Sequence, residues 1–204
     1  MLLLIVTAIF VKQMRDFNYK KAVQALNLLA RWSGGGLNKM KALKLIWLAD
    51  RFHLRKYGRP IIQDYYVAME NGPVASATRD ILQRNKFGVK QDVLKYADDF
   101  ISESGSYDFK SVNEPNVKVF SKSDLECLKS VFDTYGHLSK YDLRDLTHKF
   151  PEWKRWEEGL KKKEYNSHPM DYDDFFLNPS SAQPLFDEDQ QDLALVHKFF
   201  LRKD

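Results

Sequence analysis

The chain has 204 residues, of which 44% are hydrophobic and 29% are charged, and its formal net charge is +4. This balance is too apolar for a disordered chain and too charged for a membrane-embedded one, and the length suffices for one domain with a sizeable core. Because Cys127 is the only cysteine, an intramolecular disulfide and a cysteine-rich zinc site are excluded. We therefore expect a globular protein of the reducing cytoplasm.

The first eleven residues form an apolar run that is far shorter than the ~20 residues of a membrane-spanning helix. The run also lacks the basic segment and the cleavage site of a secretory signal. Two interpretations remain open: an element buried on the body of the protein, or an extension ahead of a start at Met14, which we favour. We accordingly treat residues 1–13 as an apolar extension and expect no membrane partner.

Helical spacing of apolar residues predicts a first helix over residues 18–32, which the glycine tract 34–36 ends. A second helix should follow the N-cap residue Asn38, run to Tyr57 and end at Gly58. Its apolar residues fall on nearly all sides of the helix, which predicts a central, buried position.

Further elements follow from apolar patterns, turn residues and capping boxes. In chain order we expect a strand over 65–69, a short helix over 75–85, a hairpin within 89–120, a helix from Ser123 (capping box with Glu126) to Gly136, a helix from Ser139 (capping box with Asp142) to about Lys149, a helical turn from Pro151 and an amphipathic helix from Asp187. The fold class is therefore mainly α with a small antiparallel β-sheet (α+β), in a compact single domain.

Charge is distributed unevenly along the chain. Residues 12–60 contain twelve Lys and Arg against two acidic residues, whereas residues 164–192 contain eight acidic residues and no Lys or Arg. We expect one domain over residues 14–163, with residues 164–204 forming an acidic loop and a C-terminal amphipathic helix packed on that domain.

A basic stripe is expected on the second helix, where Lys41, Lys44, Arg51 and Arg55 fall within about 80° of one another. Three explanations compete for this stripe: a solvated face that pairs with the acidic segment, a phosphate-binding surface, and a docking site for an acidic protein. Intramolecular pairing is the simplest of the three.

Few residues have the spacing of a catalytic or metal site. Asp50 and His53 share one helix face at i, i+3, where a carboxylate could orient an imidazole as a base, but no nucleophile stands near them in sequence. A structural role for this pair is the stronger reading, and a hydrolase is the weaker one. The histidines lack metal-ligand spacing and no phosphate-binding motif is present, so we expect no catalytic residue, metal or cofactor.

Several ordered motifs are similar to those of one family. The residues that carry the resemblance are Asp50, His53, Tyr57, Gly58, Arg59, Pro60, Asn71, Gly72, Pro73, Thr147, His148 and Trp153. Over roughly residues 19–160 the chain resembles the Panacea domain, also called the SocA-like antitoxin domain. Read on their own, these residues look like scaffold: a buried helix, a chain reversal and a strand end followed by a helix.

The resemblance implies a non-enzymatic antitoxin of bacteria or their phages that neutralises a toxin encoded beside it by protein–protein contact. It also allows delivery of the bound toxin to a cytosolic protease. The candidate partner-binding residues are Lys41, Lys44, Arg51 and Arg55, with any exposed Trp32, Tyr65 or Trp153 as aromatic anchors. The alternative is a nucleic-acid-binding or phage-associated regulatory protein that uses the stripe of residues 41–55.

Overall fold

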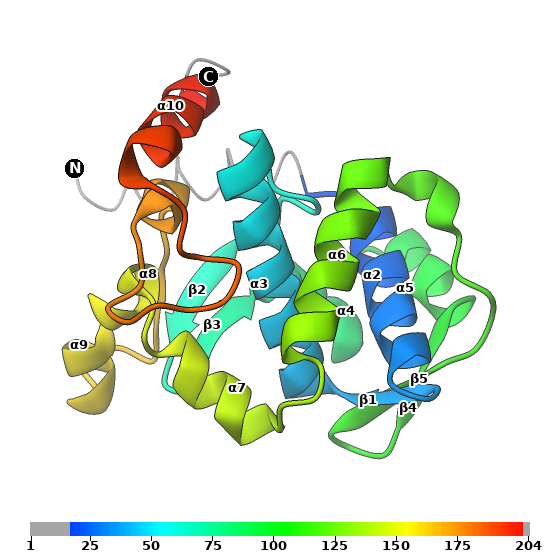
Figure 1. The fold of residues 1–204 in the computed structure, drawn as a ribbon. Coiled ribbons are helices and arrows are strands. Elements are labelled where there is room, and N and C mark those ends of the chain that lie inside the picture. The colour runs from blue at the N-terminus through cyan, green and yellow to red at the C-terminus, as the bar shows by residue number, and fades with distance from the viewer. Residues whose placement is uncertain (1–16, 202–204) are drawn as a thin grey trace.

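The structure is a computed structural model that describes residues 17–201 (Figure 1). Its α-helices are α2 (Tyr19–Trp32), α3 (Lys39–Tyr57), α4 (Ser76–Leu82), α5 (Gln91–Asp98), α6 (Lys122–Tyr135), α7 (Lys140–Thr147), α8 (Pro151–Lys154), α9 (Glu157–Lys161) and α10 (Gln190–Leu201). Its strands are β1 (Gly36–Asn38), β2 (Tyr66–Met69), β3 (Gly72–Ala75), β4 (Ile101–Ser104), β5 (Asp108–Ser111) and β6 (Ser167–Pro169), and its 3-10 helices are η1 (Val117–Val119) and η2 (Tyr172–Phe176). The expected apolar extension, residues 1–13, lies outside the described residues.

Helix α3 is the centre of the fold, as its sequence predicts. The Asn38 side chain caps its start by accepting the N–H groups of Met40 and Lys41, and Gly58 ends it with a left-handed φ of 64°. Figure 1 shows α3 between α6 and α2 on one side and β2 and β3 on the other. Most of its residues are buried, including the indole of Trp47. The predicted bounds and central position of this helix are confirmed.

The β-structure consists of two antiparallel sheets with the strand orders β1-β5-β4 and β3-β2-β6. In the first sheet Leu37 pairs with Phe109, and in the second Val67 pairs with Val74 across the β2–β3 hairpin. Strand β6 pairs with β2, so part of the acidic segment belongs to a sheet whose other strands come from residues 66–75. The predicted fold class, mainly α with a small antiparallel β component, is confirmed.

Two local predictions are corrected. The expected hairpin within 89–120 is narrower, because residues 91–98 form helix α5 and only β4 and β5 form the hairpin. The capping box of α6 lies two residues earlier than expected: the Ser121 hydroxyl accepts the N–H of Asp124, whose carboxylate accepts the N–H of Ser121. Asp124 is buried, and its other contacts favour this register over the one that begins at Ser123.

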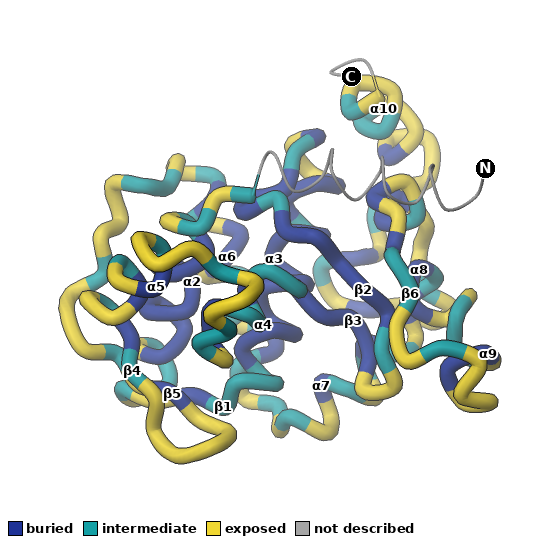
Figure 2. Tube along the Cα trace, turned by 180° about the vertical axis from the view of Figure 1, so that it is seen from behind, coloured by how far each residue is buried: buried dark blue, intermediate teal, exposed yellow. Residues whose placement is uncertain are grey.

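Figure 2 shows β2, β3 and much of α3 in the buried colour, whereas the loop between β4 and β5 is exposed. The core beside α3 is rich in aromatic rings, and Trp47 packs edge-on against Phe150 and Phe175. Cys127 is buried in α6, where burial raises the pKa of its thiol to about 12. It is therefore a buried core thiol rather than a reactive one.

Candidate functional site

The turn between β2 and β3 forms one wall of the candidate site. Gly72 in this turn has a φ of +95°, and a Cβ atom there would lie 2.8 Å from both the Lys44 Nζ and the Thr147 Oγ1 atoms. Only glycine combines that backbone conformation with that close approach. The Lys44 ammonium group donates to the Pro73 carbonyl oxygen at 2.6 Å, which fixes the turn to α3.

Residues at the end of α7 and in α8 pack against the same β2–β3 turn. The Trp153 indole N–H donates to the Met69 carbonyl oxygen at 2.8 Å, and the His148 ring stacks on Trp153 with 3.7 Å between ring centroids. Burial lowers the pKa of His148 to about 4, so its ring is neutral at pH 7. Motif residues that are about eighty positions apart in the chain therefore converge on one hairpin.

An open groove of about 840 Å³ lies in front of this turn. It is lined by Asn38, Lys39, Met40, Leu43, Lys44, Met69, Glu70, Asn71, Val74, Arg79, Leu82, Gln83, Ser106, Tyr107, Lys140, Tyr141 and Asn166. Tyr107, from the loop between β4 and β5, is 76% exposed, and Tyr141, from the first turn of α7, is 55% exposed. The groove combines an apolar lining, two accessible aromatic rings and several cations, which is the composition of a protein-binding surface.

The structure corrects the expected basic stripe on α3. Lys44, Arg51 and Arg55 are 1%, 0% and 2% exposed, and only Lys41 is partly accessible. The Lys41 ammonium group donates to the Gly136 carbonyl oxygen at 2.6 Å. These four side chains do not form an exposed stripe, because helix α3 is surrounded by other elements on the side that they occupy.

Two arginines of α3 instead hold the segment that precedes α10. The Arg51 Nε atom donates to the Glu152 carboxylate at 2.6 Å, and its Nη2 atom donates to the Leu177 carbonyl oxygen. The Arg55 guanidinium forms an ion pair with Glu188 at 2.6 Å. One ion pair thus joins the basic helix to the acidic segment, and it connects the buried Arg55 to the partly buried Glu188 rather than crossing a solvated face.

The expected aromatic anchors are mostly interior as well. Tyr65 and Trp153 are 5% and 2% exposed, whereas Trp32 is partly exposed and its ring packs on Phe132 with 5.3 Å between centroids. Of these three residues, only Trp32 can reach a partner without rearrangement of the described structure.

Asp50 is a structural carboxylate in the interior of the protein. Its oxygens accept the N–H groups of Ile61 and Ile62 at 2.9 and 3.0 Å and the Tyr66 hydroxyl at 2.9 Å. Burial raises the pKa of Asp50 to about 7 even though these three donors oppose the change. The carboxylate therefore satisfies the backbone of the segment that follows the chain reversal at Pro60.

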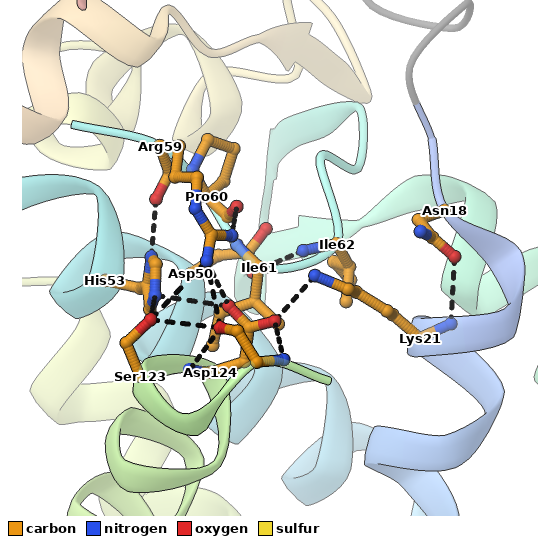
Figure 3. Close-up of polar contacts among 11 residues, drawn as sticks. Asn18, Lys21, Asp50, His53, Arg59, Pro60, Ile61, Ile62, Ser123 and Asp124 are labelled. Carbon is orange, nitrogen blue, oxygen red and sulfur yellow. Dashed lines mark hydrogen bonds and ion pairs between the residues drawn. The ribbon is translucent and has the colours of Figure 1, made fainter. Parts of the chain in front are cut away.

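His53 belongs to a different polar cluster, which Figure 3 displays around the start of α6. Its Nδ1 atom lies 2.7 Å from the Arg59 carbonyl oxygen, and its Nε2 atom lies 3.0 Å from the Ser123 hydroxyl and 3.2 Å from Asp124. A carbonyl oxygen can only accept, so Nδ1 carries a proton. Burial lowers the pKa of His53, which favours the neutral ring with Nε2 as an acceptor.

Asp124 is the acidic centre of that cluster. Its carboxylate forms ion pairs with Lys21 of α2 at 2.6 Å and with Arg59 at 2.9 Å. Burial alone would raise the pKa of Asp124, but these cations and the hydrogen bonds from Lys21 and Ser121 hold it below its ordinary value. The cluster ties α2, the end of α3 and α6 together.

The motif residues at the end of α3 are also placed as scaffold. The Tyr57 ring is 39% exposed and lies against His53 with 4.7 Å between ring centroids, and Gly58 lies against Val196 of α10. Pro60 is buried, and the chain turns there so that Ile61 and Ile62 reach Asp50.

The weaker alternative, in which Asp50 orients His53 as a base, disagrees with these contacts. The described structure contains no hydrogen bond between these two side chains. Asp50 accepts hydrogen bonds from Ile61, Ile62 and Tyr66. His53 is hydrogen-bonded to Arg59 and Ser123 instead. The structural interpretation of both residues agrees with these contacts. Within residues 17–201 no group of three or more His, Cys, Asp or Glu side chains could hold a metal ion.

The groove residues were not singled out by the sequence. Tyr107 follows the Ser104-Gly105-Ser106 turn of a hairpin, and Tyr141 lies two residues after the capping residue Ser139. Residues in a turn and in the first turn of a helix are often exposed, which is the only sequence signal for these two aromatic side chains. Their convergence with Arg79 depends on how α4, α7 and the hairpin pack around α3, which no local pattern encodes. No helix in the described part of the chain is long and apolar enough to cross a membrane.

Comparison with known proteins defines the class of the chain. The family model of the antitoxin SocA-like Panacea domain matches residues 43–154, which is more than half of the sequence. The chain therefore belongs to the SocA-like Panacea domain family. The match begins at Leu43 in α3 and ends at Lys154 in α8, so it contains every motif residue that converges on the β2–β3 turn. No curated protein and no solved structure matches the chain.

Proposed function

We propose that this protein is an antitoxin that neutralises a toxin encoded beside it, and that the toxin binds in the groove in front of the β2–β3 turn. One observation carries the proposal. In a chain of an antitoxin family, the motif residues Gly72, Pro73, Thr147, His148 and Trp153 converge on the hairpin that walls an open groove. Scaffold motifs that build one surface indicate where the partner binds.

The chemistry of the groove supports a protein partner. Tyr107 and Tyr141 present exposed rings, and aromatic side chains are frequent anchors of protein interfaces. The apolar lining, which includes Met40 and Met69, offers a surface that adapts to a partner's side chains. A standard interface buries about 800 Å² on each partner, so the toxin would also cover the rim of the groove.

Co-expression tests the proposed function. The adjacent reading frame should stop growth when it is expressed alone, and growth should return when this chain is expressed with it. The two proteins should also co-purify as a complex. Toxicity that persists in the presence of this chain, without a complex, would refute the antitoxin assignment.

Co-expression in cells that lack their cytosolic ATP-dependent proteases distinguishes two modes of neutralisation. Direct inhibition predicts that rescue persists in cells that lack their cytosolic ATP-dependent proteases. Delivery of the toxin to a protease predicts that rescue is lost in those cells and that the toxin accumulates. We propose direct inhibition, because an occluding contact needs only the groove and no further factor.

Aromatic substitutions locate the binding surface. Tyr107→Ala and Tyr141→Ala should each weaken the complex roughly tenfold, which is typical of interface anchors. Phe199→Ala is the matched control, because Phe199 is 62% exposed on α10, away from the groove. Full affinity in both tyrosine variants, together with a loss in the Phe199 variant, would move the interface to α10.

A further inference from the structure

We propose that the groove takes an acidic segment of the toxin, an inference that rests on the proposed function and specifies the chemistry of the partner. Four cations line the groove, Lys39, Lys44, Arg79 and Lys140, against the single carboxylate of Glu70. Three of these cations have no close carboxylate partner in the described structure.

Lys44 is a buried cation without a counter-ion. It is 1% exposed, and its ammonium group has the Pro73 carbonyl oxygen, the Thr147 hydroxyl and the neutral His148 ring as neighbours. Residues 17–201 provide it with no ion pair to a carboxylate, whereas buried lysines are almost always paired. Burial lowers its pKa to about 7, and no acidic neighbour opposes that change. A carboxylate brought into the groove would stabilise the protonated form.

Two cations on the rim are similarly available. Arg79 approaches Asp80 only at 3.7 Å, and its Nη1 atom contacts the Met69 sulfur. Its Nε atom is buried, and residues 17–201 provide no hydrogen-bond partner for it. The Lys140 ammonium group lies over the Tyr141 ring at 5.1 Å and pairs with no carboxylate of the described chain. Lys39 differs from both, because it already forms an ion pair with Glu103 at 2.8 Å.

The start of α3 adds to the positive potential. Asn38, Lys39 and Met40 line the groove at the N-terminus of this 19-residue helix, whose first turn contains no acidic residue. The N-terminal end of a helix carries a partial positive charge that favours anions nearby. This dipole and the cations Lys44, Arg79 and Lys140 therefore all favour an anion in the groove.

The acidic segment of this chain is not the occupant. None of its eight carboxylates lines the groove, and three of them are engaged elsewhere: Glu188 pairs with Arg55, Asp174 with Arg155, and Asp173 lies 2.8 Å from His197. A nucleic acid fits less well than a protein, because the groove is lined by apolar side chains and carries the exposed Glu70 carboxylate. A toxin segment with carboxylates between apolar side chains satisfies both the cations and the lining.

Calorimetric titration with the purified product of the adjacent reading frame tests the inference. Lys44→Met and Lys140→Met should each weaken binding about tenfold, and the affinity of the wild-type chain should fall as salt is raised. Lys122→Met is the matched control, because the Lys122 side chain is 91% exposed at the start of α6 and does not line the groove. This substitution should leave the affinity unchanged. Thermal unfolding of each variant verifies that it is folded, and Arg79→Met replaces Lys44→Met if that variant does not fold.

The outcomes separate the inference from the proposed function. If the wild-type chain binds the toxin and the groove variants bind equally well, the acidic-segment inference is wrong while the antitoxin assignment stands. If the wild-type chain does not bind the toxin, the proposed function fails. Tighter binding of a 20-nucleotide single-stranded DNA than of the toxin, lost in Lys44→Met, would assign the groove to nucleic acid and overturn the inference.

Discussion

Replacing Lys44 by methionine should change the stability of the free protein in a pH-dependent way. Methionine keeps most of the length of the lysine side chain but removes its charge and its hydrogen bond to the Pro73 carbonyl oxygen. The unfolded chain holds the lysine proton up to its ordinary pKa of 10.5, whereas burial lowers the folded-state pKa to about 7. Between these pH values the unfolded state binds more protons, so the stability of the wild-type protein rises with pH there.

The size of the effect follows from the pKa difference. Each pH unit is equivalent to about 1.4 kcal/mol, so burying the charge costs up to about 4–5 kcal/mol at and below pH 7 and nothing near pH 10.5. Loss of the hydrogen bond leaves the carbonyl group of Pro73 without its donor, which costs about 1–3 kcal/mol at every pH. Lys44→Met should therefore be more stable than the wild type by about 1–4 kcal/mol at pH 6–7 and less stable near pH 10.

Urea unfolding followed by tryptophan fluorescence at pH values from 6 to 10 measures this difference. The neighbours of Lys44 do not obscure it, because the Thr147 hydroxyl does not titrate in this range and burial lowers the pKa of His148 to about 4. Lys122→Met, at a 91% exposed position, should track the wild type throughout. A difference between Lys44→Met and the wild type that stays constant with pH would refute the assignment of Lys44 as an uncompensated buried cation.

Three further substitutions test the scaffold. Gly72→Ala, which combines a φ of +95° with a Cβ contact of 2.8 Å, should lower the melting temperature strongly, whereas Gly36→Ala, whose Cβ meets nothing closer than 3.6 Å, should not. Asp50→Ala leaves three buried donors unpaired and should destabilise by roughly 3 kcal/mol or more in urea unfolding, while Asp50→Asn should cost less because it retains an acceptor for the backbone N–H groups. Glu152→Gln removes the negative charge that pairs with the buried Arg51 guanidinium, so it should destabilise the protein by about 3 kcal/mol. An unchanged unfolding midpoint would contradict the buried ion pair.

Most of the helices follow from local sequence signals, since their start and end residues act within a few positions. Asn38 and Gly58 define α3, and Ser139 with Asp142 defines the start of α7. The register of α6 is ambiguous in the sequence, because Ser121 and Ser123 both have an acidic residue three positions later. The choice between them depends on cations that arrive from α2 and from the end of α3, which are distant in the chain.

The candidate site was predictable only in part. The helical wheel correctly placed Lys41, Lys44, Arg51 and Arg55 on one side of α3, but a wheel does not tell which elements cover that side. The carboxylates that pair with Arg51 and Arg55 are 101 and 133 residues away, and Lys44 has none within the described structure. The groove depends on the same long-range packing, so it emerged only with the tertiary structure.

Hydrogen–deuterium exchange of the purified complex tests most directly whether the toxin occupies the groove. We expect toxin binding to slow exchange in the β2–β3 turn, in the loop that carries Tyr107 and at the start of α7 around Tyr141. Exchange along α10, where Leu195 and Phe199 are exposed, should stay the same. Protection confined to α10, with unchanged exchange around the groove, would contradict the account.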